Sequence, residues 1–193
     1  MTQFRLNNRW TIWLLILIFV IPLIAAYFLS KNHEQMGLGT KNHGQLITPP
    51  LDFNQLKPVT TTTWRGQWML LLVIPTHCDS FCEKQIYLMQ QIRTATGKDS
   101  NRVTRGVLTF STENKPLATL VQTRFPGTHY FTTSTERFQN LVKGSSLEKV
   151  AFMPGNIYLV DPQGNILMRY PAQTNPMGIF KDLTLLLKIS NIG

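Results

Sequence analysis

The feature that most constrains this chain is an uninterrupted apolar run near its N-terminus, WTIWLLILIFVIPLIAAYFL, over residues 10–29. Twenty residues in a helix extend about 30 Å, which is the thickness of the hydrocarbon core of a bilayer. Trp10 and Trp13 lie at one end of the run and Tyr27 at the other, where interfacial aromatic side chains are common. The run therefore predicts a single transmembrane helix over 10–29, preceded by a short tail over 1–9.

Two other interpretations of this run are a cleaved signal peptide and a buried helix of a soluble protein. The apolar region of a signal peptide spans about 7–15 residues and is followed by small residues. Ala25 and Ala26 supply only a weak cleavage site, because the apolar run continues over 27–29. A helix of this length without a charge is also unusual in a soluble core. We therefore expect an uncleaved anchor.

The charges that flank the run bear on its orientation. Arg5 and Arg9 precede it, and Lys31 and Lys41 follow it. The positive-inside rule gives a modest preference for an N-terminus in the cytoplasm. In a bacterium, such a single-pass protein of the cytoplasmic membrane would have its 1–9 tail in the cytoplasm and its remaining residues in the periplasm.

The chain is basic, with a formal charge of +9 at neutral pH. A plainly soluble basic surface is one interpretation, and attraction to anionic lipid headgroups or to an acidic partner is the sharper one. The Lys and Arg residues are scattered along the chain without a cluster. We therefore expect no nucleic-acid partner.

The pattern changes twice after the apolar run. Residues 30–55 are rich in Gly and Pro and show no apolar period, which predicts a stalk. Residues 56–193 then alternate strand-like and helix-like segments, which is typical of an α/β sheet with helices packed on it. Strands are expected at 68–75, 103–110, 129–132, 157–160 and 166–170, and helices at 79–96, 116–125, 135–143 and 175–188. This order predicts a thioredoxin-like domain over 56–193.

The two cysteines of the chain, Cys78 and Cys82, lie in the segment THCDSFC. They come directly after the first buried strand and at the start of the following helix. The N-terminus of a helix stabilises a thiolate, and a protonated His77 would act in the same direction. The alternative, two incidental buried cysteines, is disfavoured because both cysteines of the chain meet at this one point. We therefore take Cys78 and Cys82 as the candidate catalytic residues.

The spacing of the pair limits its chemistry. On a regular helix, the Cβ atoms of residues i and i+4 are about 5–6 Å apart, whereas a disulfide requires about 3.8 Å. A bond between Cys78 and Cys82 therefore requires Cys78 to lie in the loop before the helix, or it is strained. A soft metal ion such as Cu(I) tolerates the wider gap. The spacing favours metal handling or a labile redox pair over a structural disulfide.

A third metal ligand is less evident from the sequence. Met153 precedes Pro154, and in a thioredoxin-like layout this proline approaches the cysteines and is often cis. Met153 is therefore a candidate soft ligand beside Cys78 and Cys82, and His77 is another. His129 is more typical of a core or surface position, and His33 and His43 fall in the predicted stalk.

Several segments resemble a known family. WRGQWMLLLVIPTHCDSFC and IYLVDPQGN are similar to the Sco/SenC proteins, which are membrane-anchored, thioredoxin-like copper-delivery factors for cytochrome oxidase with a Cys-x-x-x-Cys motif. The whole chain resembles a proteobacterial group of cytochrome oxidase-associated transmembrane proteins still more closely. The segments that carry this second resemblance are NHGQLITPP, CDSFC, IYLVDPQGNILMRYP and LLKISNIG.

The resemblance implies a role in assembling a haem–copper oxidase, with copper as cargo and an oxidase subunit or a copper-insertion factor as partner. Two departures from Sco qualify it. Glu83 stands where Sco proteins have a proline after the second cysteine, and Met153 occupies the approximate place of their copper-binding histidine. Both cysteines with Met153, a two-coordinate Cu(I) site, and pure thiol redox chemistry all remain open. So do a general thiol–disulfide oxidoreductase and a non-catalytic scaffold of the oxidase, and enzyme activity is left undecided.

Overall fold

The computed structural model describes residues 8–31, 42–59, 64–110 and 114–190. These form two compact units, Met1–Lys41 and Asn42–Gly193. The first unit contains the helix α1 (Asn8–Lys31), with Pro22 inside it and large apolar side chains exposed along it. Within the described residues, no helix is long and apolar enough to cross a membrane. The structure contains the helix expected at 10–29, but it does not show that this helix spans a bilayer.

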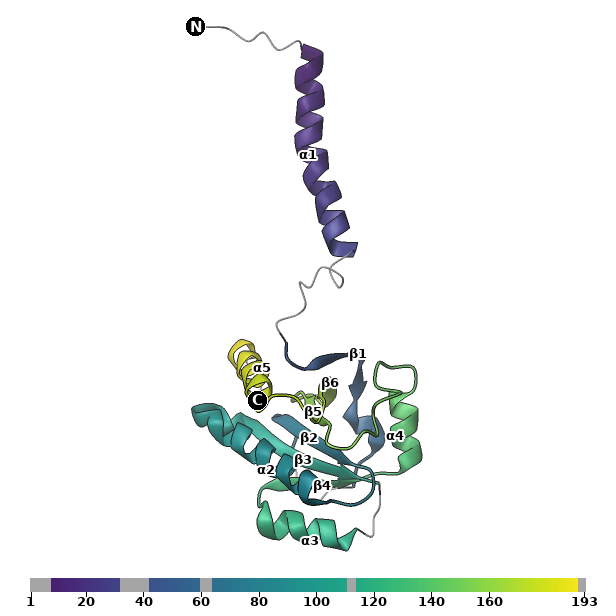
Figure 1. Ribbon diagram of the computed structural model, residues 1–193, viewed down its shortest axis with the longest axis vertical. Coiled ribbons are helices and arrows are strands. Elements are labelled where there is room, and N and C mark those ends of the chain that lie inside the picture. Colours follow the sequence, from purple (N-terminus) through teal and green to yellow (C-terminus); the bar gives the residue numbers. More distant parts are fainter. Residues whose placement is uncertain (1–7, 32–41, 60–63, 111–113, 191–193) are drawn as a thin grey trace. The chain divides into compact units, whose positions relative to one another are not determined.

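The second unit is built on one six-stranded sheet, with the strand order β1-β6-β5-β2-β3-β4 (Figure 1). The strands β2, β3 and β4 are parallel, and β5, β6 and β1 continue the sheet in antiparallel fashion. The bounds are β1 (Gln45–Asp52), β2 (Trp68–Ile74), β3 (Val103–Thr109), β4 (Thr128–Thr132), β5 (Ile157–Val160) and β6 (Asn165–Tyr170). The mixed α/β, thioredoxin-like arrangement expected from the sequence is confirmed.

Helices cover both faces of this sheet, so the domain has three layers. One face packs against α2 (Ser80–Ala95), α3 (Lys115–Arg124) and α5 (Pro176–Ile189). The other face packs against α4 (Thr135–Val142) and the short helix η1 (Phe53–Leu56), whereas η2 (Gly97–Arg102) links α2 to β3. Every residue of β2 is buried, because this central strand has a core on each side. The predicted strands and helices agree with these bounds to within one residue at each end.

The prediction of a stalk over 30–55 fails for its second half. Residues 45–52 form β1, which pairs with β6 at the edge of the sheet, and residues 53–56 form η1. Only Ile47 and Leu51 of β1 are buried, and the pairing shifts register between Leu46 and Leu51, around Pro49 and Pro50. An edge strand tolerates proline in this way, and its sequence then shows no alternation. Residues 32–41 of the stalk, with His33, lie outside the described residues.

The residues that begin the folded domain are attached to α5 through one buried carboxylate. Asp182 accepts hydrogen bonds from the backbone N–H groups of His43 and Gly44, at 2.8 and 2.9 Å, and lies 2.9 Å from Nδ1 of His43. The hydroxyl of Tyr170 donates to the same carboxylate at 3.3 Å. Burial, and then the charge of Asp182, raise the pKa of Tyr170. This carboxylate therefore joins the N-terminal segment, β6 and α5.

We expect Asp182→Asn to lower the free energy of unfolding by about 2 kcal/mol, because hydrogen bonds to a buried charge lose strength when the charge is removed. Urea unfolding of the full-length protein in detergent measures the change. Glu136→Gln, at an exposed position in α4, is the matched control and should leave the stability unchanged. Equal stabilities of the two variants would contradict this role of Asp182.

Candidate functional site

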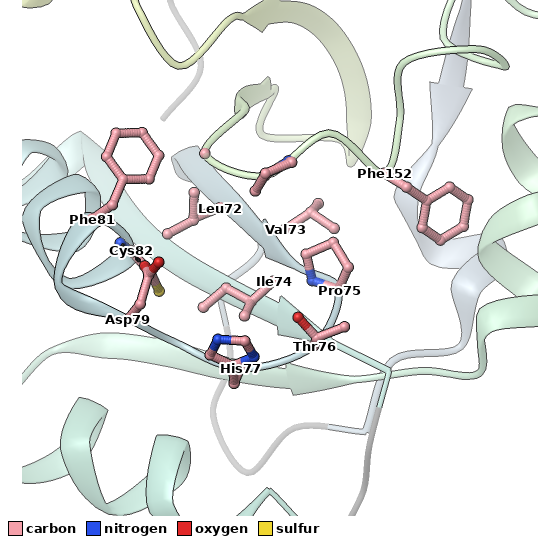
Figure 2. Close-up of a pocket in the computed structure, with 12 residues that line it drawn as sticks. Leu72, Val73, Ile74, Pro75, Thr76, His77, Asp79, Phe81, Cys82 and Phe152 are labelled. Atoms are coloured by element: carbon pink, nitrogen blue, oxygen red, sulfur yellow. Dashed lines mark hydrogen bonds between the residues drawn. The ribbon is translucent and has the colours of Figure 1, made fainter.

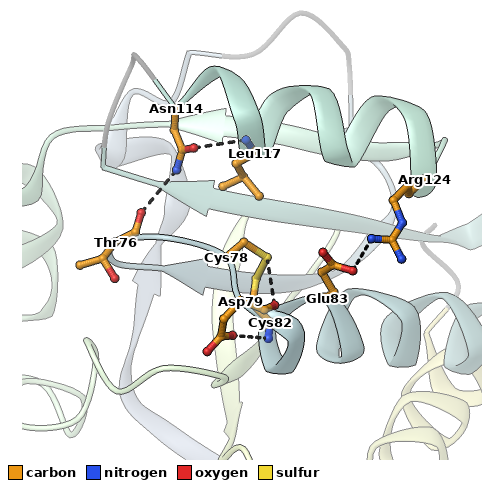
Figure 3. The surroundings of a disulfide bond; sticks show 8 residues. All are labelled: Thr76, Cys78, Asp79, Cys82, Glu83, Asn114, Leu117 and Arg124. Atoms are coloured by element: carbon orange, nitrogen blue, oxygen red, sulfur yellow. Dashed lines mark hydrogen bonds and ion pairs between the residues drawn. A yellow bond between two sulfur atoms is a disulfide. The ribbon is translucent and has the colours of Figure 1, made fainter.

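The cysteine pair lies where the central strand leads into the first helix of the domain. Strand β2 ends at Ile74, α2 begins at Ser80, and Cys78 lies in the loop between them. Asp79 is the N-cap of α2, and its Oδ1 accepts a hydrogen bond from the N–H of Cys82 at 2.9 Å (Figure 3). This cap satisfies one of the free N–H groups of the helix start and fixes Cys82 in the first turn.

Cys78 and Cys82 form a disulfide bond, drawn as the yellow bond in Figure 3. Their Cα atoms are 5.1 Å apart, within the usual range of about 4.4–6.8 Å for disulfides. The bond is possible because Cys78 precedes the helix, which is the condition that the spacing predicted. Cys82 is 7% exposed, whereas Cys78 is only half-buried against the core under α2. Cys78 is therefore the more accessible sulfur.

Charged side chains of both signs surround the pair. Asp79 is exposed, and Glu83 lies one residue after Cys82, where it forms an ion pair with Arg124 of α3. A carboxylate near a sulfur disfavours the thiolate form of that sulfur, so Asp79 opposes the stabilisation that the helix N-terminus supplies. Asp79 was not among the predicted site residues, although an Asp directly before an apolar-periodic segment is a common N-cap signal.

The loop that carries Cys78 is also linked to the start of α3. Nδ2 of Asn114 donates a hydrogen bond to the carbonyl oxygen of Thr76 at 3.4 Å. Oδ1 of the same side chain accepts from the N–H of Leu117 at 3.2 Å and so caps α3 (Figure 3). The start of α3 therefore helps to fix the loop that precedes Cys78.

A pocket of about 390 Å³ opens beside Cys82. Figure 2 draws the residues that line it. Cys82, Phe81, Phe152 and Pro154 contribute to its lining, together with the end of β2. Gly155 has a φ of +78°, and a Cβ there would collide with the ring of Phe81. The glycine thus lets this ring lie against the loop before β5. We call this hollow the Cys82 pocket, and it offers an apolar surface next to a bond that can exchange.

The structure separates the candidate third ligands. His77 is exposed and lines the Cys82 pocket, but Met153 is 51% exposed and lines a different hollow with Arg169 and Gln173. Pro154 does lie at the Cys82 pocket as expected. The sequence left open whether the bond before Pro154 is cis, and the cis peptide bond among the described residues is Thr48–Pro49 instead.

A larger metal site commonly draws on His, Cys, Asp and Glu side chains that lie close together. Among the described residues, no group of three or more such side chains could hold a metal ion. His129 lies on β4 with its ring stacked on that of Phe131, 6.0 Å between centroids. Burial and then Arg105 lower the pKa of His129. It is therefore a partly buried histidine of the sheet, as its sequence context suggested.

Comparison with known proteins places this domain in a family. The family described as transmembrane-like, thioredoxin-like, C-terminal domain matches residues 68–190, which is more than half of the chain. The chain belongs to this family. No curated protein matches it. The family match covers β2, both cysteines and every later strand and helix of the domain.

Solved structures with a similar fold include three Sco proteins, each with a TM-score of 0.50. Copper-bound ScoI of Arabidopsis thaliana is 14% identical, with 65% of this chain and 87% of that chain covered. A SCO1/SenC family lipoprotein of Bacillus anthracis is 15% identical, with 72% and 98% covered. BsSco, described with a disulfide switch in the Sco family of cytochrome c oxidase assembly proteins, is 18% identical, with 73% and 97% covered. The resemblance to Sco/SenC proteins is thus confirmed for the fold.

We expect Asp79→Ala to lower the free energy of unfolding by about 1 kcal/mol, because the N–H of Cys82 loses its acceptor. Asp79→Asn keeps a capping oxygen but removes the charge, so it should preserve stability and still make the disulfide easier to reduce. Urea unfolding and equilibration with glutathione measure the two effects separately. If Asn and Ala variants behave alike in both measurements, the separation of cap and charge is wrong.

Proposed function

We propose that this protein is an assembly factor for a haem–copper respiratory oxidase, and that it controls the redox state of the thiols of the oxidase's copper site through Cys78 and Cys82. The observation that carries the proposal is the disulfide itself, which joins a half-buried Cys78 to Cys82 at the start of α2 and beside an apolar pocket. The Sco-like fold supports the choice of an oxidase as the client.

The chemistry is a thiol–disulfide exchange in which the described disulfide is the oxidised product. In the reduced protein, the thiolate of Cys78 attacks a client disulfide, forms a mixed disulfide and displaces one client thiolate. The thiolate of Cys82 then attacks Cys78, which releases the second client thiolate and closes the 78–82 bond. Two electrons pass to the client, and a thiol reductant of the same compartment must restore the dithiol.

The exposure of the two sulfurs supports these separate roles. Cys78 is the more accessible and therefore the attacking cysteine, whereas Cys82 is buried and held by the Asp79 cap, which suits a resolving cysteine. The Cys82 pocket lies where residues of a client next to its disulfide would rest. An apolar client segment fits the rings of Phe81 and Phe152 in its lining.

Delivery of copper is a second candidate, with copper as cargo rather than as a resident cofactor. Reduction would free two thiolates, and soft thiolates select Cu(I). His77 lines the same pocket as Cys82, so it is better placed than Met153 to supply a third donor. Titration of the reduced full-length protein with Cu(I) under anaerobic conditions tests this candidate. Stoichiometric binding lost in His77→Ala but kept in Met153→Ala is expected, and no stoichiometric binding would eliminate it.

We also propose where the protein acts. The apolar run of α1 attaches the chain to the cytoplasmic membrane, with residues 1–9 in the cytoplasm and the thioredoxin-like domain in the periplasm. The uncharged sequence of 10–29 and the flanking Arg5 and Arg9 support this topology. The copper-binding subunit of an oxidase, or a factor that inserts its copper, would then be the partner on the same side.

The decisive variant replaces both cysteines, because it separates exchange or copper chemistry from a purely structural role. We expect full-length Cys78→Ser/Cys82→Ser, expressed in a deletion strain, to leave oxidase activity and oxidase copper content at the level of the deletion. Ser80→Ala, at an exposed position between the cysteines, is the matched control and should restore both. Restoration by the double variant would favour the scaffold alternative over our proposal.

A general periplasmic oxidoreductase is the remaining alternative, and the same strains distinguish it. A general enzyme would change the redox state of many secreted proteins when it is deleted. Our proposal expects the loss to be confined to the oxidase. Cys78→Ser should likewise change the rate at which the protein reduces model disulfides very little. A general oxidoreductase would lose this activity in the same variant.

A further inference from the structure

The outer side of α5 has an unusual combination of side chains for the surface of a soluble domain. Three exposed large apolar residues, Met177, Leu185 and Ile189, are 50–68% exposed. Lys181 and Lys188 are exposed between and beside them. Their spacing of three, four and seven residues places them on one side of a helix. We call these five residues the α5 outer face.

The α5 outer face contains no negative charge. The single acidic residue of the helix, Asp182, is 4% exposed, and its carboxylate binds His43, Gly44 and Tyr170 in the interior. Helices at a lipid–water interface use both large apolar residues and lysines to bind lipid, and this side of α5 offers both without an acidic residue. Anionic headgroups would complement the lysines, and the acyl boundary would take the apolar side chains.

The N-terminal chain meets the domain at the border of this face. His43 packs on Gly178, where a Cβ would lie 2.7 Å from the Cβ of His43, and it is bound by Asp182. Gly178, Asp182, Leu185 and Ile189 follow each other at intervals of four, three and four residues, so they form one row along α5. The two residues that contact His43, Gly178 and Asp182, are therefore in the same row as two apolar residues of the α5 outer face.

The length of the connection limits how far the domain can be from a membrane that holds α1. Residues 32–41 join Lys31 of α1 to Asn42 of the domain. Ten residues extend at most about 36 Å. A membrane that holds α1 is thus within reach of α5, which contacts the first residues of the domain.

We infer that the α5 outer face docks on the surface of an anionic lipid bilayer. This inference rests on the proposed attachment of α1 to the membrane, and it adds a second contact made by the domain itself. Docking would restrict the rotation of the domain about its connection and so hold the cysteine pair in a limited set of orientations towards a membrane-embedded client.

A spin label on the α5 outer face tests the inference in the full-length protein. In a Cys78→Ser/Cys82→Ser background, Thr184→Cys places a nitroxide on this side of α5 and leaves Met177, Leu185 and Ile189 intact. The label then has a single thiol to react with, because the chain has no other cysteine. The control label replaces Gln122, an exposed residue of α3. Both proteins are reconstituted in phosphatidylcholine vesicles that contain phosphatidylglycerol, and collisions with oxygen and with a water-soluble nickel complex are compared.

We expect the label at 184 to be several-fold less accessible to nickel than the label at 122, while oxygen still reaches it. Lys181→Gln/Lys188→Gln, or vesicles without phosphatidylglycerol, should return nickel access to the level of the control. A label at 184 as accessible to nickel as the control would contradict docking, although protein that withstands a carbonate wash would still be attached through α1. Shielding from both reagents would indicate a protein contact and overturn the lipid assignment. Release by carbonate would contradict the attachment and the docking together.

Discussion

The hydrogen bond from the N–H of Cys82 to the carboxylate of Asp79 is the interaction on which the site depends. It sets the first residue of α2, and so it decides that Cys78 lies in the loop while Cys82 lies in the first helical turn. A helix begun one turn earlier would place both cysteines on one helical face at a separation that does not suit a disulfide. The same carboxylate places a negative charge beside the sulfurs. One side chain therefore determines both the geometry and the electrostatics of the pair.

The elements around the site follow from strong local patterns, so they were predictable. Strand β2 is a continuous apolar run. Asn175 and Pro176 are typical residues for the N-cap and the first position of a helix, so they indicate the start of α5. Strand β1 was not predicted because it contains two prolines and only two buried side chains. Its sequence therefore does not alternate between apolar and polar residues. Recognition of β1 requires knowledge of its partner β6, which local sequence does not contain.

The position of the Met153 side chain could not be predicted for a different reason. The loop before β5 does reach the cysteine pair, as a thioredoxin-like arrangement requires, and Phe152 and Pro154 line the Cys82 pocket. Met153 lies between them and lines another hollow. An irregular loop has no periodic pattern that tells which side chain faces which way. The sequence therefore identified the loop but not which of its residues line the Cys82 pocket. Most residues that line this pocket are apolar, which suits an apolar segment of a protein client.

The central claim is that Cys78 exchanges disulfides with the copper-binding subunit of an oxidase. The most direct measurement is to trap the mixed disulfide in cells that express full-length Cys82→Ser, in which the resolving thiol is missing. The account predicts a reducible adduct between this variant and that subunit, absent from Cys78→Ser/Cys82→Ser. An equal amount of adduct in both strains, or none in either strain while the oxidase assembles normally, would contradict the account.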